Sequence, residues 1–222
     1  NKVRDLLDEA GKLGSDIVCF QEGMNYVTNN PMKSEPVPGP TTNLVAEKAK
    51  EYGMYAIPSL LEKRGESVYN ISALIDRKGE IVGKYLKTHP NPGEARNIKV
   101  GEDLPVFETD FGRIAMLICN DIHFPEIARV YTLKGAQLLI FSGSCIGFSP
   151  LDYETMFRAL MIDNCIYGVI ANTLLPDLSP YFCSTVMRTV VVAPDGHVIA
   201  GKVAPWSVVS AKIDLENVPL VK

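Results

Sequence analysis

Three side chains that can carry hydrolytic chemistry stand at the ends of strand-like segments of the 222-residue sequence. Glu22 and Cys119 each come soon after an apolar run, and Lys87 ends another. A carboxylate, an ammonium and a thiol can serve as general base, oxyanion donor and nucleophile in acyl transfer. If the fold brings the three together, they form a complete set for cysteine-based hydrolysis.

Cys119 has the sequence setting of a nucleophile on a strand-to-helix turn, although the G-x-S-x-G signature is absent. Residues 114–118 are apolar throughout, as in a strand buried on both faces. Asn120 and Asp121 break the run, and Pro125 suits the first turn of a helix. Helix N–H groups near a thiol favour the thiolate. An inert buried cysteine is the commoner explanation for a cysteine taken alone.

The candidate base and the candidate oxyanion donor each have an ordinary alternative. Glu22 follows a buried strand and could act as a base at the sheet edge, or it could be a solvated loop acid. Lys84 and Lys87 are three residues apart on a strand, so at most one of them points inward. Two solvent-exposed lysines on an edge strand are the usual case. Glu94, in the loop behind them, could pair with an inward lysine or be exposed.

The elements that must position these residues are predicted by hydrophobic periodicity and turn residues. Helices are expected from residue 1 to about 13, from Thr41 or Thr42 (as the N-cap) to about 52, and over 125–135 and 151–165. Strands or hairpins are expected over 16–20, 55–63, 68–87, 112–119, 136–143, 167–173, 185–202 and 207–215. The alternation in the middle of the chain, with hairpins elsewhere, predicts an α/β domain with mixed sheets.

The composition excludes several classes of protein. A net charge of −4 without a run of basic residues argues against nucleic acid as a partner. The apolar runs are far shorter than the ~20 residues of a membrane span, so no membrane association is expected. No two of the five cysteines form a CxxC pair, which argues against a zinc ribbon or disulfide framework and favours the cytoplasm. The three histidines lack metal-ligand spacing, so we expect no metal.

Taken together and in this order, the signals resemble the nitrilase superfamily of carbon–nitrogen hydrolases. The resemblance rests on a glutamate after a buried strand, Lys-x-His at the end of a hairpin, and Cys-x-Asp-x-x-Phe-Pro-Glu after another strand. It extends from the first helix to the closing SAKIDL. It implies a four-layer α-β-β-α sandwich with mixed sheets, assembly into a homodimer or higher homo-oligomer, and no cofactor.

The resemblance also assigns roles to residues. The family's base, lysine and nucleophile match Glu22, Lys87 and Cys119, and its second glutamate matches Glu94. The backbone N–H of Asn120 joins Lys87 as an oxyanion donor. The expected substrate-binding residues are Asn120, Tyr26 and Ser144.

The sequence departs from the family pattern at several points. Gln21 stands where proline is common, and Leu160 and Asp163 stand where a helix of the family has arginine and glutamate. We expect residues 1–222 to form a single hydrolase domain that lacks the family's first strand and C-terminal tail.

The resemblance implies hydrolysis of a small amide or N-carbamoyl compound through a cysteine thioester. Nitrile hydrolysis and acyl transfer to an amine use the same three residues and stay open as alternatives. A binding or scaffold protein that keeps the fold without turnover is the rival from another class.

Overall fold

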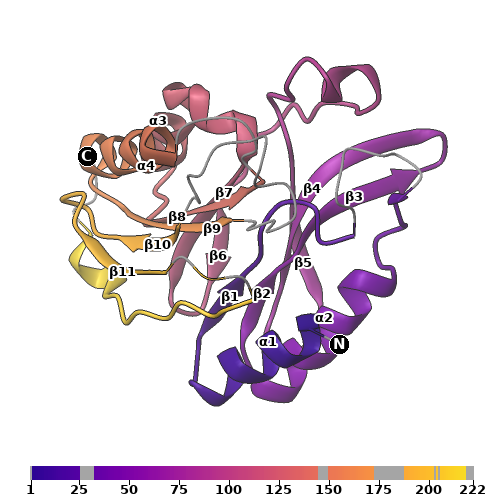
Figure 1. Ribbon diagram of the computed structural model, residues 1–222, viewed down its shortest axis with the longest axis horizontal. Coiled ribbons are helices and arrows are strands. Elements are labelled where there is room, and N and C mark those ends of the chain that lie inside the picture. The colour runs from indigo at the N-terminus through magenta and orange to yellow at the C-terminus, as the bar shows by residue number, and fades with distance from the viewer. Residues whose placement is uncertain are drawn as a thin grey trace. The chain divides into compact units, whose positions relative to one another are not determined.

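The computed structural model describes residues 2–25, 33–144, 150–172, 188–202, 204 and 206–218 (Figure 1). The chain forms two compact units, residues 1–103 and 104–222. Each unit has one β-sheet and two α-helices among its described residues.

The first unit contains a five-stranded mixed sheet. Its elements are α1 (Lys2–Lys12), β1 (Ile17–Cys19), α2 (Pro40–Tyr52), β2 (Tyr55–Ile57), β3 (Ser59–Arg64), β4 (Ser67–Ile75), β5 (Ile81–Leu86) and the 3₁₀ helix η2 (Glu94–Arg96). The strand order is β1-β2-β4-β3, with β5 also paired to β4. β1 and β2 run parallel, whereas the other pairs are antiparallel.

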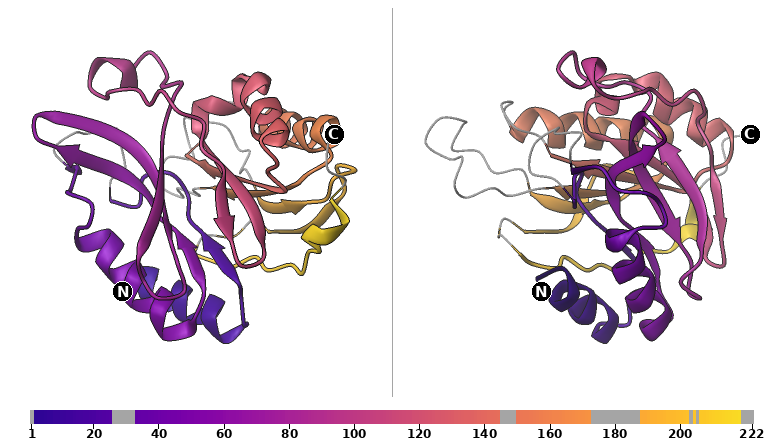
Figure 2. Two further views of the ribbon diagram at one scale, coloured as in Figure 1. Left: turned by 180° about the vertical axis from the view of Figure 1, so that it is seen from behind. Right: turned by 90° about the vertical axis from the view of Figure 1, so that its right-hand side faces the viewer.

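The two helices of the first unit lie side by side, as both views of Figure 2 show. α1 buries Leu7 and Ala10, and α2 buries Val45 and Ala49, so each helix presents an apolar stripe to the core. One face of the sheet carries the apolar cluster of Leu60, Ile71 and Ala73. Asn70 lies between Tyr69 and Ile71 on β4, so its side chain points to the opposite face.

The second unit contains a six-stranded sheet in the order β11-β10-β9-β8-β7-β6. Its elements are β6 (Phe107–Thr109), β7 (Gly112–Ile118), the 3₁₀ helix η3 (Cys119–His123), α3 (Pro125–Leu133), β8 (Leu138–Gly143), α4 (Pro150–Asn164), β9 (Tyr167–Asn172), β10 (Thr189–Val192), β11 (Val198–Lys202) and η5 (Leu215–Asn217). β7, β8 and β9 are parallel, and the outer pairs are antiparallel.

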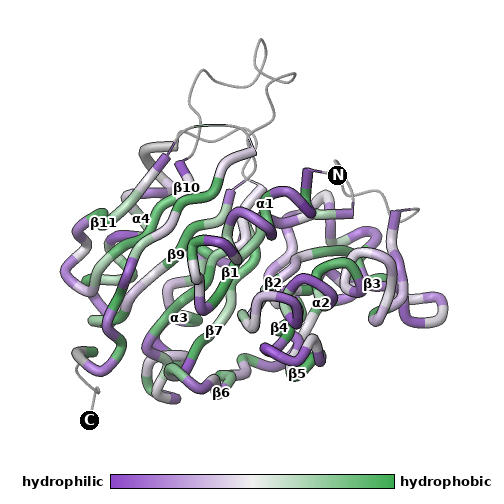
Figure 3. Tube along the Cα trace, turned by 90° about the horizontal axis from the view of Figure 1, so that it is seen from below, coloured by the Kyte–Doolittle hydropathy of each residue, from purple (hydrophilic) through white to green (hydrophobic). Residues whose placement is uncertain are grey.

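The parallel strands β7 and β8 are mostly apolar and buried. Figure 3 shows hydrophobic residues along β9 and along its antiparallel neighbour β10. α4 packs on β9 at Gly168, where a Cβ atom would lie 2.5 Å from the ring of Phe157. Phe157 also contacts Phe141 of β8, with ring centroids 5.9 Å apart. A glycine at residue 168 therefore permits the close approach of helix and sheet.

The structure confirms the predicted α/β class with mixed sheets and the hairpins around residues 76–79 and 194–196. The predicted N-cap of α2 at Thr41 or Thr42 is wrong, because the helix begins after Gly39, with Pro40 in its first turn. Thr42 still serves this end of the helix, since its hydroxyl accepts the Gly39 N–H at 2.8 Å.

The predicted strand at 207–215 is also wrong. Its alternating pattern suits a strand, but it has no ladder partner among the described residues. The side chain of Gln137 donates to the Leu215 carbonyl at 2.7 Å and anchors the segment instead. No helix in the described part of the chain has the length and apolar character that a membrane span requires.

Candidate active site

The first unit brings Glu22, Lys87 and Glu94 into one buried cluster. Lys87 Nζ donates to Glu22 Oε1 at 2.9 Å and to Glu94 Oε1 and Oε2 at 2.9 and 2.7 Å. Lys87 and Glu94 are each 1% exposed and Glu22 is 6% exposed. Groups of this charge are almost never buried unless they are paired. The solvated alternatives for these three residues are therefore wrong.

Glu22 is positioned by the chain that continues alongside the sheet after β1. The Phe20 N–H donates to the Ile57 carbonyl at 3.0 Å, and the Met24 N–H donates to the Ser59 carbonyl at 2.8 Å. Glu22 thus sits in a stretch held on both sides by backbone hydrogen bonds. This explains how a loop carboxylate keeps a fixed place.

The two lysines of the β5 segment point to opposite faces, as their spacing predicted. Lys84 pairs across the sheet with Ala73 and binds Glu62, with its Nζ 2.7 Å from Oε1. Lys87 continues the ladder beyond β5, donating its backbone N–H to the Asn70 carbonyl at 2.8 Å. Its side chain extends to the face that carries Glu22. Lys87 is therefore the inward lysine.

Glu94 begins the 3₁₀ helix η2 and is held by a turn at Asn91. The Asn91 side-chain oxygen accepts the N–H groups of Gly93 and Glu94 at 2.9 and 3.0 Å. The Asn91 N–H in turn donates to Glu94 Oε2 at 2.9 Å. The Glu94 carboxylate is thus oriented by the backbone N–H of Asn91 as well as by Lys87.

Asn70 is part of this cluster, and the sequence reasoning missed it. Its side-chain Nδ2 donates to Glu22 Oε1 at 2.7 Å and to Glu94 Oε1 at 3.2 Å. Asn70 is fully buried on β4. The available signal was an amide in the middle of the apolar run VYNISALI, since a buried amide needs partners.

In the second unit, Cys119 directly follows β7 in an unusual backbone conformation. Its φ is +47°, in the left-handed region that residues other than glycine rarely adopt. Asp121, which is fully buried, accepts the Ile118 N–H on its Oδ2 at 2.9 Å. This hydrogen bond closes the turn around Cys119, and such strain is common at functional sites.

The helix beyond Cys119 is arranged differently from the expectation. The 3₁₀ helix η3 occupies residues 119–123, and α3 begins only at Pro125, which takes the predicted first-turn position. Cys119 therefore lies at the start of a single tight turn and not at the N-terminus of α3. Cys119 is half-buried and forms no disulfide with another described residue.

The predicted substrate-binding residues lie in different parts of the chain. Asn120 belongs to η3, and Ser144 follows β8 directly; both are half-buried. Because β7 and β8 are parallel and pair Ile118 with Ser142, Cys119 and Ser144 fall at the same edge of the sheet. Tyr26 lies outside the described residues.

The family to which the chain belongs is decided by its match to a family model. The model described as carbon-nitrogen hydrolase matches residues 1–222. The chain belongs to the carbon–nitrogen hydrolase family. It is accordingly an enzyme that cleaves carbon–nitrogen bonds with a cysteine nucleophile, as the sequence predicted.

Relatives and solved structures of similar sequence or fold cover nearly the whole hydrolase. Omega-amidase NIT2 of Xenopus tropicalis is 33% identical over 97% of this chain and 83% of its own length. The carbon-nitrogen hydrolase of Helicobacter pylori G27 superposes with a TM-score of 0.85 at 25% identity, covering 97% of this chain and 83% of that one. Nit3 of Saccharomyces cerevisiae gives a TM-score of 0.85 at 23% identity, covering 99% and 88%. These likenesses confirm the nitrilase-type α/β fold class.

The departures from the family pattern have local consequences in this hydrolase. Leu160 is buried in α4, and Asp163 is exposed with its carbonyl bound by Arg129 at 2.7 Å. Arg158 donates to the Gly196 carbonyl at 2.7 Å. Arg158, two residues before the position where the family has arginine, therefore binds a backbone carbonyl.

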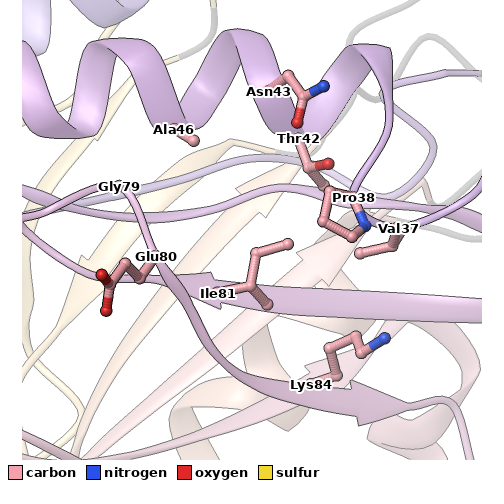
Figure 4. Close-up of a pocket in the computed structure, with 9 residues that line it drawn as sticks. All are labelled: Val37, Pro38, Thr42, Asn43, Ala46, Gly79, Glu80, Ile81 and Lys84. Carbon is pink, nitrogen blue, oxygen red and sulfur yellow. The ribbon is translucent and has the colours of Figure 1, made fainter.

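A surface pocket of about 520 Å³ lies elsewhere in the first unit, between α2 and the β4–β5 hairpin (Figure 4). It contains none of the predicted site residues, and its lining residues are Val37, Pro38, Thr42, Asn43, Ala46, Gly79, Glu80, Ile81 and Lys84. In the described part of the chain, no group of three or more histidine, cysteine or acidic side chains is arranged to hold a metal ion.

Proposed function

We propose that this hydrolase cleaves a small amide through a thioester on Cys119, with Glu22 as general base and Lys87 as electrostatic catalyst. The observation that carries the proposal is the buried contact of Lys87 with both Glu22 and Glu94. An ion cluster of this kind is costly to bury, and well-packed hydrophobic residues can often replace one without loss of stability. The left-handed turn at Cys119 adds a second, independent sign of a functional residue.

Acylation begins when Glu22 takes the thiol proton and the sulfur of Cys119 attacks the carbonyl carbon. The backbone N–H of Asn120 and the Lys87 ammonium stabilise the oxyanion, each donor contributing roughly 3–4 kcal/mol. Glu22 then gives its proton to the leaving nitrogen, the carbon–nitrogen bond breaks, and ammonia or an amine departs. The acyl group remains on sulfur as a thioester.

Deacylation reverses these roles with water as the nucleophile. Glu22 takes a proton from water while the oxygen attacks the thioester carbon. The carbon–sulfur bond then breaks, the carboxylic acid leaves, and the proton returns to the thiolate. Glu94 holds Lys87 in place throughout. Thiol, carboxylate and ammonium supply nucleophile, proton carrier and electrophile, so the reaction calls for no cofactor.

An amide is the substrate class best supported, because relatives that are 31–33% identical and cover 97–98% of this chain are named omega-amidases. Asn120 and Ser144 are proposed to contact the substrate, together with Tyr26. N-carbamoyl compounds, nitriles and acyl transfer to an amine are the other outcomes of the test below.

We further propose that the protein acts in the cytoplasm as a homodimer or higher homo-oligomer and that residues 1–222 fold as one hydrolase domain. No disulfide joins the described cysteines Cys19, Cys119 and Cys165 to one another, as a reducing compartment favours. Light scattering after size-exclusion chromatography tests the assembly.

The function is tested by release of ammonia from a panel of propionamide, succinamic acid, N-carbamoylalanine and propionitrile. We expect turnover of an amide and loss of turnover in Cys119→Ser and Glu22→Gln. Lys84→Met, which alters the lysine three residues before Lys87, is expected to keep near-normal turnover. Mass spectrometry of the wild-type protein, quenched in acid during turnover of the preferred amide, is expected to show an acyl adduct on Cys119. A folded protein that releases no ammonia from any compound of the panel would favour the alternative of a binding or scaffold protein without turnover.

A further inference from the structure

The hydrogen bonds of the buried cluster divide unequally among the four carboxylate oxygens. Glu22 Oε1 and Glu94 Oε1 each accept from two donors, Lys87 Nζ and Asn70 Nδ2. Glu94 Oε2 accepts from Lys87 and from a backbone N–H. Glu22 Oε2 accepts no hydrogen bond from the described residues.

We propose that Asn70 is a positioning residue of this hydrolase: its single amide group holds both glutamates and leaves Glu22 Oε2 as the oxygen that carries the proton. The inference rests on the proposed function, in which Glu22 is the base. It adds a residue to that function and assigns separate tasks to the two oxygens of Glu22.

The orientation of the Asn70 amide follows from the chemistry of its partners. Ionised carboxylates only accept hydrogen bonds, so the NH₂ end must face Glu22 and Glu94. The NH₂ group has two hydrogens, and its nitrogen lies 2.7 Å from Glu22 Oε1 and 3.2 Å from Glu94 Oε1. An amide is neutral, so it adds donors without changing the charge of the cluster.

Asn70 and Lys87 donate to the same two oxygens, Glu22 Oε1 and Glu94 Oε1, and this arrangement assigns Asn70 a role during catalysis. The three hydrogens of Lys87 match its three bonds to carboxylate oxygens, so donation to an oxyanion must redirect one of them. If the bond to Glu22 Oε1 or Glu94 Oε1 is released, Asn70 still donates to the same oxygen. An unpaired buried acceptor is thereby avoided at the moment when Lys87 turns to the substrate.

Glu22 is likewise kept in one rotamer when its proton state changes. With Oε1 tied to β4 through Asn70, the carboxylate cannot rotate freely, and Oε2 stays directed toward the proton that it takes or gives. Proton transfer is sensitive to such placement, because the base must lie within hydrogen-bond reach of the proton.

The test compares Asn70→Asp and Asn70→Ala with Ser72→Ala, assayed on the amide that the panel identifies. Asn70→Asp keeps the shape, removes the donors and adds a third carboxylate to the cluster, whereas Asn70→Ala removes the side chain without adding a charge. Ser72 is the matched control, because it is fully buried two residues along the same strand and its hydroxyl has no hydrogen-bond partner in the described part of the chain. Thermal unfolding of each variant reports folding.

We expect kcat to fall roughly 10- to 100-fold in both Asn70 variants, as loss of hydrogen bonds to charged groups predicts, with KM within about threefold of wild type. Alkylation of Cys119 by iodoacetamide is expected to slow in parallel, a change that a purely structural role would not produce in a folded variant. Ser72→Ala is expected to keep wild-type values.

Two results would overturn the role of Asn70. One is a folded variant with unchanged kcat and unchanged alkylation of Cys119. The other is failure of both Asn70 variants to fold while Ser72→Ala folds, which would make the amide a structural requirement of the sheet. The variant Glu22→Gln distinguishes failure of the Asn70 proposal from failure of the proposed function. If Glu22→Gln is inactive and the Asn70 variants have normal activity, only the role of Asn70 is refuted. If Glu22→Gln is active, the role of Glu22 as general base is refuted.

Discussion

Removal of the Lys87 ammonium should destabilise the first unit by much more than removal of an ordinary lysine. In Lys87→Met the side chain keeps much of its length but loses the charge that faces Glu22 and Glu94. Two buried carboxylates are then left without their cation. Breaking a buried ion pair in this way costs about 3–5 kcal/mol.

The loss of stability in Lys87→Met can be measured by chemical and thermal unfolding. For a protein of this size, each kcal/mol corresponds to roughly 2–4 °C in Tm, so we expect a loss on the order of 6–20 °C. Urea unfolding at neutral pH gives the free energy directly. The double variant Lys87→Met/Glu94→Gln should recover part of the loss, because it removes one of the two uncompensated charges.

Lys84→Met is the control for this prediction. Lys84 lies on the other face of β5 with its side chain 29% exposed, and its partner Glu62 also binds Arg64. We expect its loss to cost about 1 kcal/mol or less. The reasoning is refuted if Lys87→Met and Lys84→Met have equal stability, or if the double variant is less stable than Lys87→Met alone.

Three further predictions concern other parts of the chain. Asp121→Ala removes the acceptor of the Ile118 N–H and with it the hydrogen bond that closes the left-handed turn at Cys119. We expect the free energy of unfolding in urea to fall by about 1.5–3 kcal/mol and turnover to decrease. Unchanged turnover would show that catalysis does not depend on this turn. Burial raises the pKa of the Cys19 thiol to about 12, so iodoacetamide should not label Cys19 in the folded protein at pH 8 but should label it in urea. The hydrogen bond from Lys48 lowers the pKa of Asp8 below its ordinary value of 3.8. The ionised Asp8 therefore contributes to stability above pH 3.8, and this contribution is lost as the pH falls through the lowered pKa. Asp8→Asn should therefore flatten the dependence of Tm on pH below about pH 4, and an unchanged slope would contradict this.

The sequence predicted the secondary structure best where the pattern and the turn chemistry agreed. The hairpin at residues 76–79 and the alternation of strands and helices from 112 to 172 are cases where apolar periodicity and turn residues point the same way. The segment 207–215 had the periodicity of a strand, but a strand also needs a neighbour with free hydrogen-bonding groups, and no local pattern reveals this.

The site was predictable in its residue types and less so in its details. The spacing of Lys84 and Lys87 already required opposite faces, and the structure shows which of them points inward. Asn70 could not be assigned, because an amide inside an apolar strand has many explanations until its partners are known. The 3₁₀ turn after Cys119 was missed for a similar reason, since Pro125 marks where α3 begins but not how the chain reaches it.

The central claim is that Glu22 activates the thiol of Cys119, and the most direct measurement is the rate at which iodoacetamide alkylates each cysteine of the native protein near neutral pH, followed by peptide mass spectrometry. The account predicts that Cys119 reacts fastest and that Glu22→Gln slows its alkylation by roughly tenfold or more, whereas Cys165, which is exposed, keeps its rate. If Cys119 reacts no faster than Cys165, or at the same rate with and without Glu22, the claim is contradicted.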